Sequence, residues 1–304
     1  MKTNEQPLYE TVEWKKSSQI KRWTNLLLRS KTGTIGFLIV SIVVFLAIFA
    51  NQISPYDPAA INAAALLQPP VWSEGGNWAH ILGTDNLGRD MLSRLIHGSR
   101  ISLLVGVSAV IVAGVIGMAV GLIAGYFGGI IDNVLMRFVD TFLAIPSILF
   151  ILVVLGVFGP GLVTLVLVLG AINWVLYARL IRGEVLSVKE LQYVKAAKTI
   201  GTSHFKIMLK HLMPNVFSSF IVVSTLSVAT TIIVESSLSF LGLGIQPPQI
   251  TWGLMLSTGR DYLATSWWLA TFPGIAITIT VLGIIFLGDW LRDVLDPRSQ
   301  HKKS

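Results

Sequence analysis

The chain has 304 residues, of which 53% are hydrophobic and only 13% are charged. Soluble domains carry about 25% charged residues, so this composition excludes an ordinary soluble protein and indicates an integral membrane protein. The formal net charge of +7 could suggest nucleic-acid binding, but most basic residues fall on one predicted side of the membrane, as insertion requires. The absence of cysteine excludes disulfides, thiolate metal sites and cysteine nucleophiles.

The chain begins with a polar, basic segment, residues 1–32, whose apolar residues three and four apart predict an amphipathic helix at the membrane surface. The apolar run after it follows a leader that is too long for a signal peptide, so we expect a retained first transmembrane anchor over 33–53. A polar connector with four prolines occupies 54–99 and should lie outside the cytoplasm.

Residues 100–296 hold the remaining apolar runs and form a predicted five-helix core, followed by a tail at 297–304. The second span, at about 102–125, carries small residues at four-residue steps: Ala109, Ala113, Gly117, Gly121 and Gly125. Such a ridge lets another helix approach closely. Packing inside one bundle and packing between subunits explain the ridge equally well. The other spans are expected at about 138–158, from the turn at 159–161 to about 177, at 216–241 and at 269–287.

Three residues in these spans are candidates for a translocation path. Asp140 lies near the inner end of the third span, close to Arg137, and the same span carries Pro146. Glu235 is the ionisable residue nearest to membrane depth, where a charge costs about 2.5–3.5 kcal/mol on insertion scales. It should therefore face the path or a partner, or lie near the outer interface and bond to neighbouring serines. Both interpretations stay open.

A basic hairpin, residues 183–214, separates the fourth and fifth spans. Its five lysines exclude a membrane span: Lys189, Lys195, Lys198, Lys206 and Lys210. Apolar residues from Leu191 through Phe205 to Leu212 recur at the spacing of one helix face. Gly201 should end one short helix, and Ser203 should begin a second across a tight turn. Pro214 suits the first turn of the next helix.

At this hairpin the sequence resembles a known family. Ala196 and Ala197, then Gly201 and Pro214, resemble the "EAA" loop of ABC-importer permeases, the segment that seats in a groove of the cytoplasmic ATPase. The run 82–103, LGTDNLGRDMLSRLIHGSRISL, resembles the C-type permeases of dipeptide, oligopeptide and nickel importers. The chain departs from the motif where its glutamate is Lys195, and where its late isoleucine and leucine positions hold His211 and Met213.

The resemblance implies an all-α integral membrane protein with six transmembrane helices and a cytoplasmic coupling helix hairpin between the fourth and fifth, the type I ABC-importer permease fold. It implies a pathway for di- or oligopeptides formed with a second homologous permease, two cytoplasmic ATPases that hold ATP and Mg, and an extracytoplasmic substrate-binding protein. This chain would bind no cofactor and catalyse nothing. The residues implied to couple to the ATPase are Tyr193, Ala196, Ala197, Gly201, Ser203, Phe205, His211, Pro214 and Asn215.

Orientation follows from the basic residues. Of 23 Lys and Arg, the six-span topology leaves only four on the outer side, namely Arg89, Arg94, Arg100 and Arg260. Basic residues stay in the cytoplasm, so both termini and the basic hairpin should lie there, in the inner membrane of a bacterium.

Two patterns imitate sites without the necessary ligands. Gly83 and Gly88 are spaced as in a phosphate loop, but Arg and Asp follow where Lys and Ser or Thr are required. His204 and His211 could share a helix face, yet no acidic or thiol ligand accompanies them, so we expect no metal. A nickel or metallophore permease of the same family remains an alternative. A secondary carrier is weaker because the halves show no clear repeat, and no span carries the motif of an intramembrane enzyme.

Overall fold

The computed structural model describes residues 19–295, which are helical apart from connecting segments and one isolated β-bridge between Thr84 and Asp90. The helices are, in chain order, α1 (Gln19–Arg29), α2 (Lys31–Ile48), α3 (Ala50–Ile53), η1 (Ala63–Ala65), α4 (Met91–Phe127), α5 (Gly129–Ala144), α6 (Ser147–Phe158), α7 (Leu162–Val188), α8 (Gln192–Thr199), α9 (His204–Ile207), η2 (Met208–Leu212), α10 (Met213–Phe240), α11 (Trp252–Arg260) and α12 (Trp268–Leu295). In these residues five helices are long and apolar enough to cross a membrane, and the bent pair α5–α6 makes a sixth if it counts as one span.

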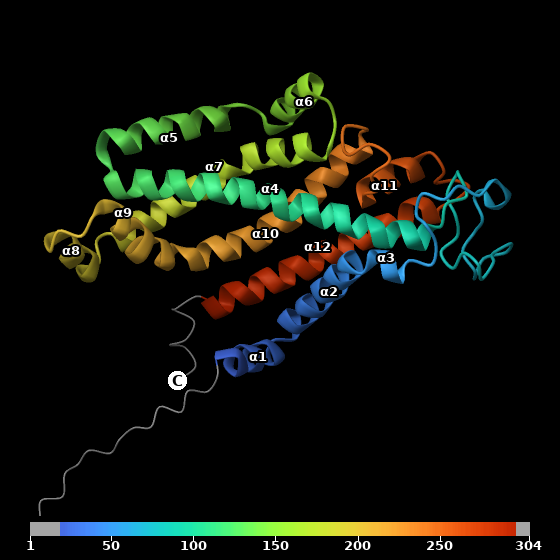
Figure 1. The fold of residues 1–304 in the computed structure, drawn as a ribbon, viewed down its shortest axis with the longest axis horizontal. Helices are drawn as coiled ribbons and strands as arrows, with labels where there is room; N and C mark the ends of the chain where they lie inside the picture. The colour runs from blue at the N-terminus through green and yellow to red at the C-terminus, as the bar shows by residue number, and fades with distance from the viewer. Residues whose placement is uncertain (1–18, 296–304) are drawn as a thin grey trace, which may run out of the picture.

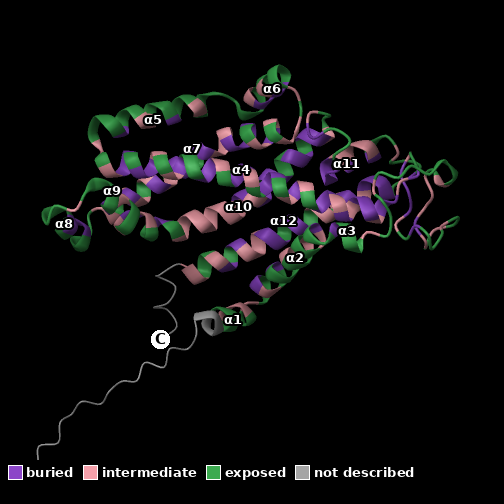
Figure 2. Ribbon diagram, viewed as in Figure 1, coloured by how far each residue is buried: buried purple, intermediate pink, exposed green. Residues whose placement is uncertain are grey.

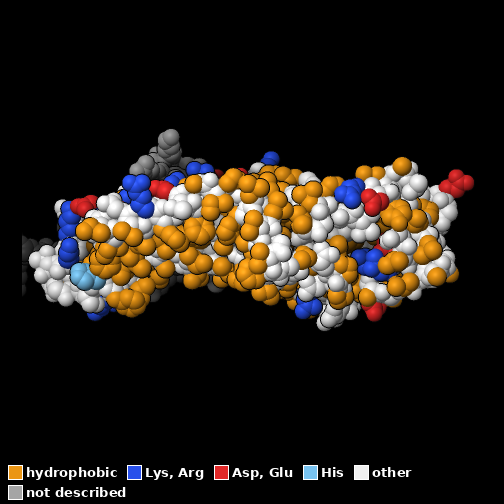
Figure 3. All heavy atoms as spheres, turned by 90° about the horizontal axis from the view of Figure 1, so that it is seen from above, with side chains coloured by type: hydrophobic (Ala, Val, Ile, Leu, Met, Phe, Trp, Pro, Cys, Tyr) orange, Lys and Arg blue, Asp and Glu red, His pale blue; other side chains and the backbone are white. Residues whose placement is uncertain are grey.

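The long helices run side by side along one axis (Figure 1). The basic hairpin lies at one end of the bundle, called the hairpin end here, and the connector lies with α11 at the other, called the connector end. Hydrophobic side chains cover the middle of the molecule, and most charged side chains gather towards the two ends (Figure 3). This distribution is the one expected of a protein that crosses a bilayer.

The small-residue ridge of α4 packs against α7 within the chain. All five of its members are buried: Ala109, Ala113, Gly117, Gly121 and Gly125. A Cβ at Gly121 would lie 2.7 Å from the carbonyl oxygen of Ala178 and 2.8 Å from Cβ of Ile181. Because no side chain fits at that distance, the glycine sets the separation of the two helices. The ridge is therefore occupied inside the subunit.

Glycines also bring α2 and α12 together. A Cβ at Gly36 would meet the carbonyl oxygen of Gly283 at 2.7 Å, and one at Gly33 would meet the ring of Trp290 at 2.6 Å. The other side of α2 is exposed and apolar, as the green residues in Figure 2 show. Trp290 also meets Trp23 of α1 edge-on, with ring centroids 6.0 Å apart. Of the amphipathic segment predicted over residues 1–32, the structure describes the part from α1 onward. Residues 1–18 lie outside the described part.

The third predicted span differs from the structure. Its helix starts at Gly129 rather than near residue 138, and it turns by 84° at Pro146 into α6. Proline has no N–H to donate and pushes the residue before it into an extended conformation. Ile145 has that conformation, with ψ of 122°. The span expected over 138–158 is therefore bent at its proline and starts nine residues earlier than predicted.

The second half of the basic hairpin is also not a separate short helix. α9, η2 and α10 form one continuous helix, His204–Phe240, of 37 residues. η2 is a π turn, whose hydrogen bonds span five residues instead of four. It ends two residues before Pro214, which cannot donate a bond to the preceding turn. The π turn thus lets the chain keep its helical path past the proline.

The connector folds back onto the start of α4. Asp90 caps this helix by accepting a 2.8 Å hydrogen bond from the N–H of Ser93, and it pairs with Nδ1 of His80 at 2.9 Å. The indole of Trp268 donates to the carbonyl oxygen of Thr84 at 3.1 Å, which ties the connector to the start of α12. α11, in the predicted loop before α12, was not anticipated.

Candidate functional site

The turn of the basic hairpin is built as the sequence predicts. Gly201 has φ of +81°, in the left-handed region that favours glycine. The N–H of Thr202 donates to the carbonyl oxygen of Ala197, and the N–H of Gly201 donates to that of Lys198, both at 3.1 Å. This pair of bonds is the Schellman ending of a helix. Ser203 occupies the N-cap position of α9, but its hydroxyl makes no capping bond.

Four apolar side chains anchor the hairpin to the bundle. Val194 of α8, together with Ile207 and Leu212, is buried in one cluster with Leu122 of α4 and the end of α7, and Ala197 of α8 is buried as well. Phe205 was expected on this face but is 69% exposed, and Ile207 takes the buried place. The hairpin is therefore fixed on its bundle side.

The outer side of the hairpin combines apolar and basic side chains. Ile200 is 81% exposed beside Phe205, and Leu191, Tyr193 and Leu209 are exposed as well. Lys198, Lys206 and Lys210 are exposed among them. Single exposed apolar residues are common on protein surfaces, but a cluster of them marks a contact site. The outer side has the composition of a protein-binding surface.

Hydrogen bonds fix the angle between the hairpin and α10. Asn215 donates from Nδ2 to the hydroxyl of Tyr193 at 2.9 Å and to the carbonyl oxygen of His211 at 2.6 Å. The rings of Tyr193 and His211 lie 6.2 Å apart. His204 bonds instead to the hydroxyl of Tyr126 at 2.7 Å. Of the predicted coupling residues, Ala196 and Pro214 are exposed close to this network.

Lys195, at the motif's glutamate position, forms an ion pair inside the hairpin. Its Nζ lies 2.8 Å from Oε2 of Glu190, and both side chains are more than half exposed. The hydrogen bond from Lys195 lowers the pKa of the Glu190 carboxyl. Lys189 turns inward and donates to the carbonyl oxygen of Gly125 at 2.7 Å. A carboxylate is thus retained beside the motif, but on the residue five positions earlier.

The three candidate path residues do not lie together. Glu235 is fully buried, and its carboxylate accepts hydrogen bonds from Ser239 at 2.8 Å and from Ser236 at 3.3 Å. Asp140 is exposed and pairs with Arg179 at 2.5 Å, rather than with Arg137. Pro146 stands at the α5–α6 bend. Both of these serines lie on α10 with Glu235, so the carboxylate is held by hydrogen bonds within its own helix.

Two ion pairs that link α5 to α7 escaped the sequence analysis. Arg182 holds Asp132 with two hydrogen bonds, Nε to Oδ1 at 2.5 Å and Nη2 to Oδ2 at 2.7 Å. The pair of Arg179 and Asp140 repeats the contact further along α5. The spacing in the sequence carries the signal. The two aspartates are eight residues apart on α5 and the two arginines are three apart on α7, so the aspartates share one helix face and the arginines share another.

A second missed cluster lies in the run 82–103. Asp85 is buried and meets Nε of Arg89 at 2.7 Å and Nε of Arg94 at 3.4 Å. It also accepts the N–H groups of Leu87 and Arg89 at 2.9 Å. These contacts stabilise the loop at the start of the run 82–103, the run whose sequence resembles that of the peptide permeases. No group of three or more potential metal ligands occurs among residues 19–295.

Comparison with known proteins identifies the family. Residues 117–301 match the family described as "Binding-protein-dependent transport system inner membrane component", and residues 18–70 match the "N-terminal TM domain of oligopeptide transport permease C". The chain is 40% identical over 281 residues to the di/tripeptide transport system permease protein DppC of Pseudomonas aeruginosa, covering 92% of this chain and 93% of that protein. It is 46% identical over 270 residues to the dipeptide transport system permease protein DppC of Escherichia coli K12, covering 89% and 90%.

The fold has a counterpart among solved structures. An inward-facing structure of the MetNI methionine ABC transporter aligns with a TM-score of 0.53 at 19% identity, over 68% of this chain and 98% of that one. The chain therefore belongs to the family of binding-protein-dependent ABC-transport permeases and is a homologue of the DppC proteins. It is a multi-pass inner-membrane component that works with ATPase and binding-protein partners, and the fold expected from the resemblance is confirmed.

Proposed function

We propose that this permease passes di- or oligopeptides into a bacterial cell, with a second homologous permease forming the other half of the pathway. The two relatives named above are named as peptide permeases, and this chain aligns with about nine-tenths of the length of each. This similarity supports the cargo class. Two cytoplasmic ATPases supply ATP and Mg, and a binding protein delivers the peptide. The chain itself holds no cofactor and performs no covalent chemistry.

The outer side of the basic hairpin is the proposed docking surface for an ATPase, and its cluster of exposed apolar and basic side chains carries the proposal. The excess of Lys and Arg at the hairpin end supports a cytoplasmic hairpin and cytoplasmic termini. Ile200 and Phe205 project from the surface and call for an apolar pocket. The lysines around them favour an acidic rim on the partner, because complementary charge speeds and orients docking.

The anchoring of the hairpin explains how ATPase motion reaches the spans. Val194 and Ile207 are buried against α4 and α7, and α9 continues without interruption into α10. When ATP closes the ATPases, the two hairpins are drawn together and the bundle turns outward to receive peptide.

The proposed division of the chain has five parts: segment 1–32, anchor 33–53, connector 54–99, core 100–296 with the coupling loop 183–214, and tail 297–304.

The test is reconstitution of the complete importer with its ATPases, second permease and binding protein. We expect ATP-dependent uptake of a labelled dipeptide, and no uptake of Ni²⁺. The variant Ile200→Asp with Phe205→Asp should lose the ATPases on purification while keeping the second permease. Ile61→Asp is the matched control, because Ile61 is 67% exposed at the connector end and should leave the ATPases bound. Full retention of the ATPases by the hairpin variant would refute docking at this surface.

A further inference from the structure

An open groove lies between the last turns of α10, Leu256 of α11 and the early part of α12, near the connector end. We propose that this groove holds the transported peptide, with Arg260 at its rim binding the free carboxylate of the peptide. The inference rests on the proposed function, because it states where the cargo of that function is held.

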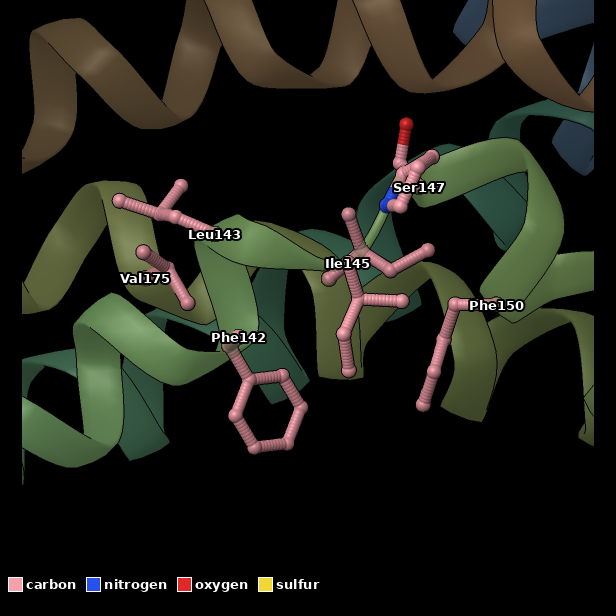
Figure 4. A pocket seen from close by; sticks show the side chains of 8 residues that line it. Phe142, Leu143, Ile145, Ser147, Phe150 and Val175 are labelled. Atoms are coloured by element: carbon pink, nitrogen blue, oxygen red, sulfur yellow. The ribbon is translucent and has the colours of Figure 1, made fainter.

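The groove has the size and the mixed lining of a small-molecule site. Its volume is about 530 Å³, and such sites measure about 300–1,000 Å³. Leu256 and Ile277 supply apolar wall, and three hydroxyl side chains lie among the lining residues. The hollow at the α5–α6 bend is smaller, about 240 Å³, and its lining has Ser147 as its one hydroxyl and no charged residue (Figure 4). Of these two spaces, the groove is the better match for a polar cargo.

Arg260 stands at the rim of the groove with much of its hydrogen-bonding capacity unused. Its Cζ atom lies 5.3 Å from the ring centroid of Phe240, which lines the groove. Nε meets Oδ1 of Asp261 at 3.3 Å, whereas the two Nη atoms make no hydrogen bond in the described part of the chain. The side chain is 49% exposed. Stacking on an aromatic ring holds a guanidinium in place, and its two Nη atoms can grip both oxygens of a carboxylate.

Hydroxyl groups inside the groove present oxygen lone pairs rather than protons. Ser237 donates its proton to the carbonyl oxygen of Ile233 at 2.8 Å, and Thr278 donates to that of Gly274 at 2.8 Å. A hydroxyl oxygen that has given its proton away still accepts hydrogen bonds, and an ammonium group has donors only. Acceptors inside the groove and a cation at its rim therefore suit a peptide that enters with its amino end first.

The other basic residues predicted on the outer side give the contrast. Arg89 and Arg94 both meet the buried Asp85. Arg100 is exposed on α4 and is not among the residues that line the groove. Among these four arginines, Arg260 is thus the one that combines free donors with a place beside the groove.

Protection of a single cysteine tests the proposal, because the native chain has no cysteine. Ser237→Cys places a thiol in the groove, and Ser41→Cys places one on the exposed, apolar side of α2 as the matched control. The chain is assembled with cysteine-free ATPases and second permease in lipid nanodiscs, without binding protein, so that peptide acts on the permeases directly. A charged methanethiosulfonate is added with and without ATP, in the presence of alanyl-alanine, of its C-terminal amide or of neither.

We expect Ser237→Cys to react at least about tenfold faster than Ser41→Cys in one nucleotide state, because a hydrated thiol forms the reactive thiolate more readily. Excess alanyl-alanine should slow the reaction about threefold or more, since mass action fills most of the grooves. The amide lacks the carboxylate and should not protect. Arg260→Gln should remove the protection, whereas Arg100→Gln, which loses the same charge on the outer side, should keep it.

Two results would overturn the proposal. If Ser237→Cys reacts as slowly as Ser41→Cys with and without ATP, lipid or the second permease covers the groove. If alanyl-alanine gives no protection, or if its protection equals that of the amide or survives Arg260→Gln, Arg260 does not bind the carboxylate. ATP-dependent uptake by the native importer with its binding protein is measured in parallel. Uptake without protection refutes the groove alone, and loss of uptake in the native importer refutes the proposed function as well.

Discussion

Asn215, in the first turn of α10, donates a 2.9 Å hydrogen bond to the hydroxyl of Tyr193 on α8. The bond crosses the basic hairpin and joins the proposed ATPase-docking element to the span. Because Asn215 also bonds to the carbonyl oxygen of His211, its side chain is held in place from two directions. The angle between hairpin and span therefore depends on a small number of polar contacts.

Removing this bond should weaken coupling without preventing assembly. We expect Tyr193→Phe to slow ATP-dependent uptake by about two- to tenfold, corresponding to a net hydrogen bond of about 0.5–1.5 kcal/mol. In a double-mutant cycle, Asn215→Ala should cost less in the Tyr193→Phe background than in the parent, because the contact between the two side chains is already lost there. Strictly additive effects on uptake would show that the two side chains act independently.

Gly201 should tolerate no other residue well. A side chain at φ of +81° costs about 1–2 kcal/mol, and a Cβ there would meet nothing within 4 Å, so the cost is conformational rather than steric. We expect Gly201→Ala to insert normally but to reduce ATPase co-purification and uptake. Gly183→Ala, on α7 with equally open surroundings, is the matched control and should behave as the parent. Equal uptake by the two variants would contradict the turn's role.

The α4–α7 contact predicts that alanine substitutions at two glycines change the stability of the protein in opposite directions. Alanine has a higher helix propensity than glycine by about 1 kcal/mol, so Gly156→Ala, where a Cβ has open space, should be neutral or stabilising. Gly121→Ala should destabilise by about 1–3 kcal/mol, because the new Cβ would overlap α7. Thermal denaturation of the purified importer measures both. A stabilising Gly121→Ala would mean that the helices can separate freely.

Glu235→Gln tests the acidic residue in α10. Gln can still accept a hydrogen bond from one serine through its carbonyl oxygen and can donate its amide N–H to the hydroxyl of the other, so we expect uptake within about threefold of the parent. Glu235→Leu removes both acceptors and should lower the melting temperature. If Glu235→Gln abolished uptake while the importer remained intact, the carboxylate charge would belong to the transport step rather than to packing.

The basic hairpin shows how far sequence reasoning reached. The turn at Gly201 was predictable because only glycine readily adopts that conformation, and its neighbours supply the lysines that exclude a span. Phe205 was misplaced because a tight turn restarts the helix, so the periodicity of α8 does not continue into α9. The continuity of α9 with α10 depends on a π turn, which has no clear sequence pattern.

The bend at Pro146 was only half predictable. Proline marks a place where a helix can break, but the 84° direction depends on where Phe142, Phe150 and Trp174 pack. Likewise, the small-residue ridge predicted a close helix contact but did not name the partner. Both outcomes are decided by contacts between segments far apart in the chain, which local patterns do not encode.

The unbroken helix from His204 to Phe240 belongs both to the basic hairpin and to the membrane span. With 37 residues it is about 55 Å long, and it joins the proposed docking surface to the other end of the bundle without a break between helices. The Gly201 turn precedes this helix, so a substitution there should change how the hairpin sits on a partner and should leave the long helix itself intact.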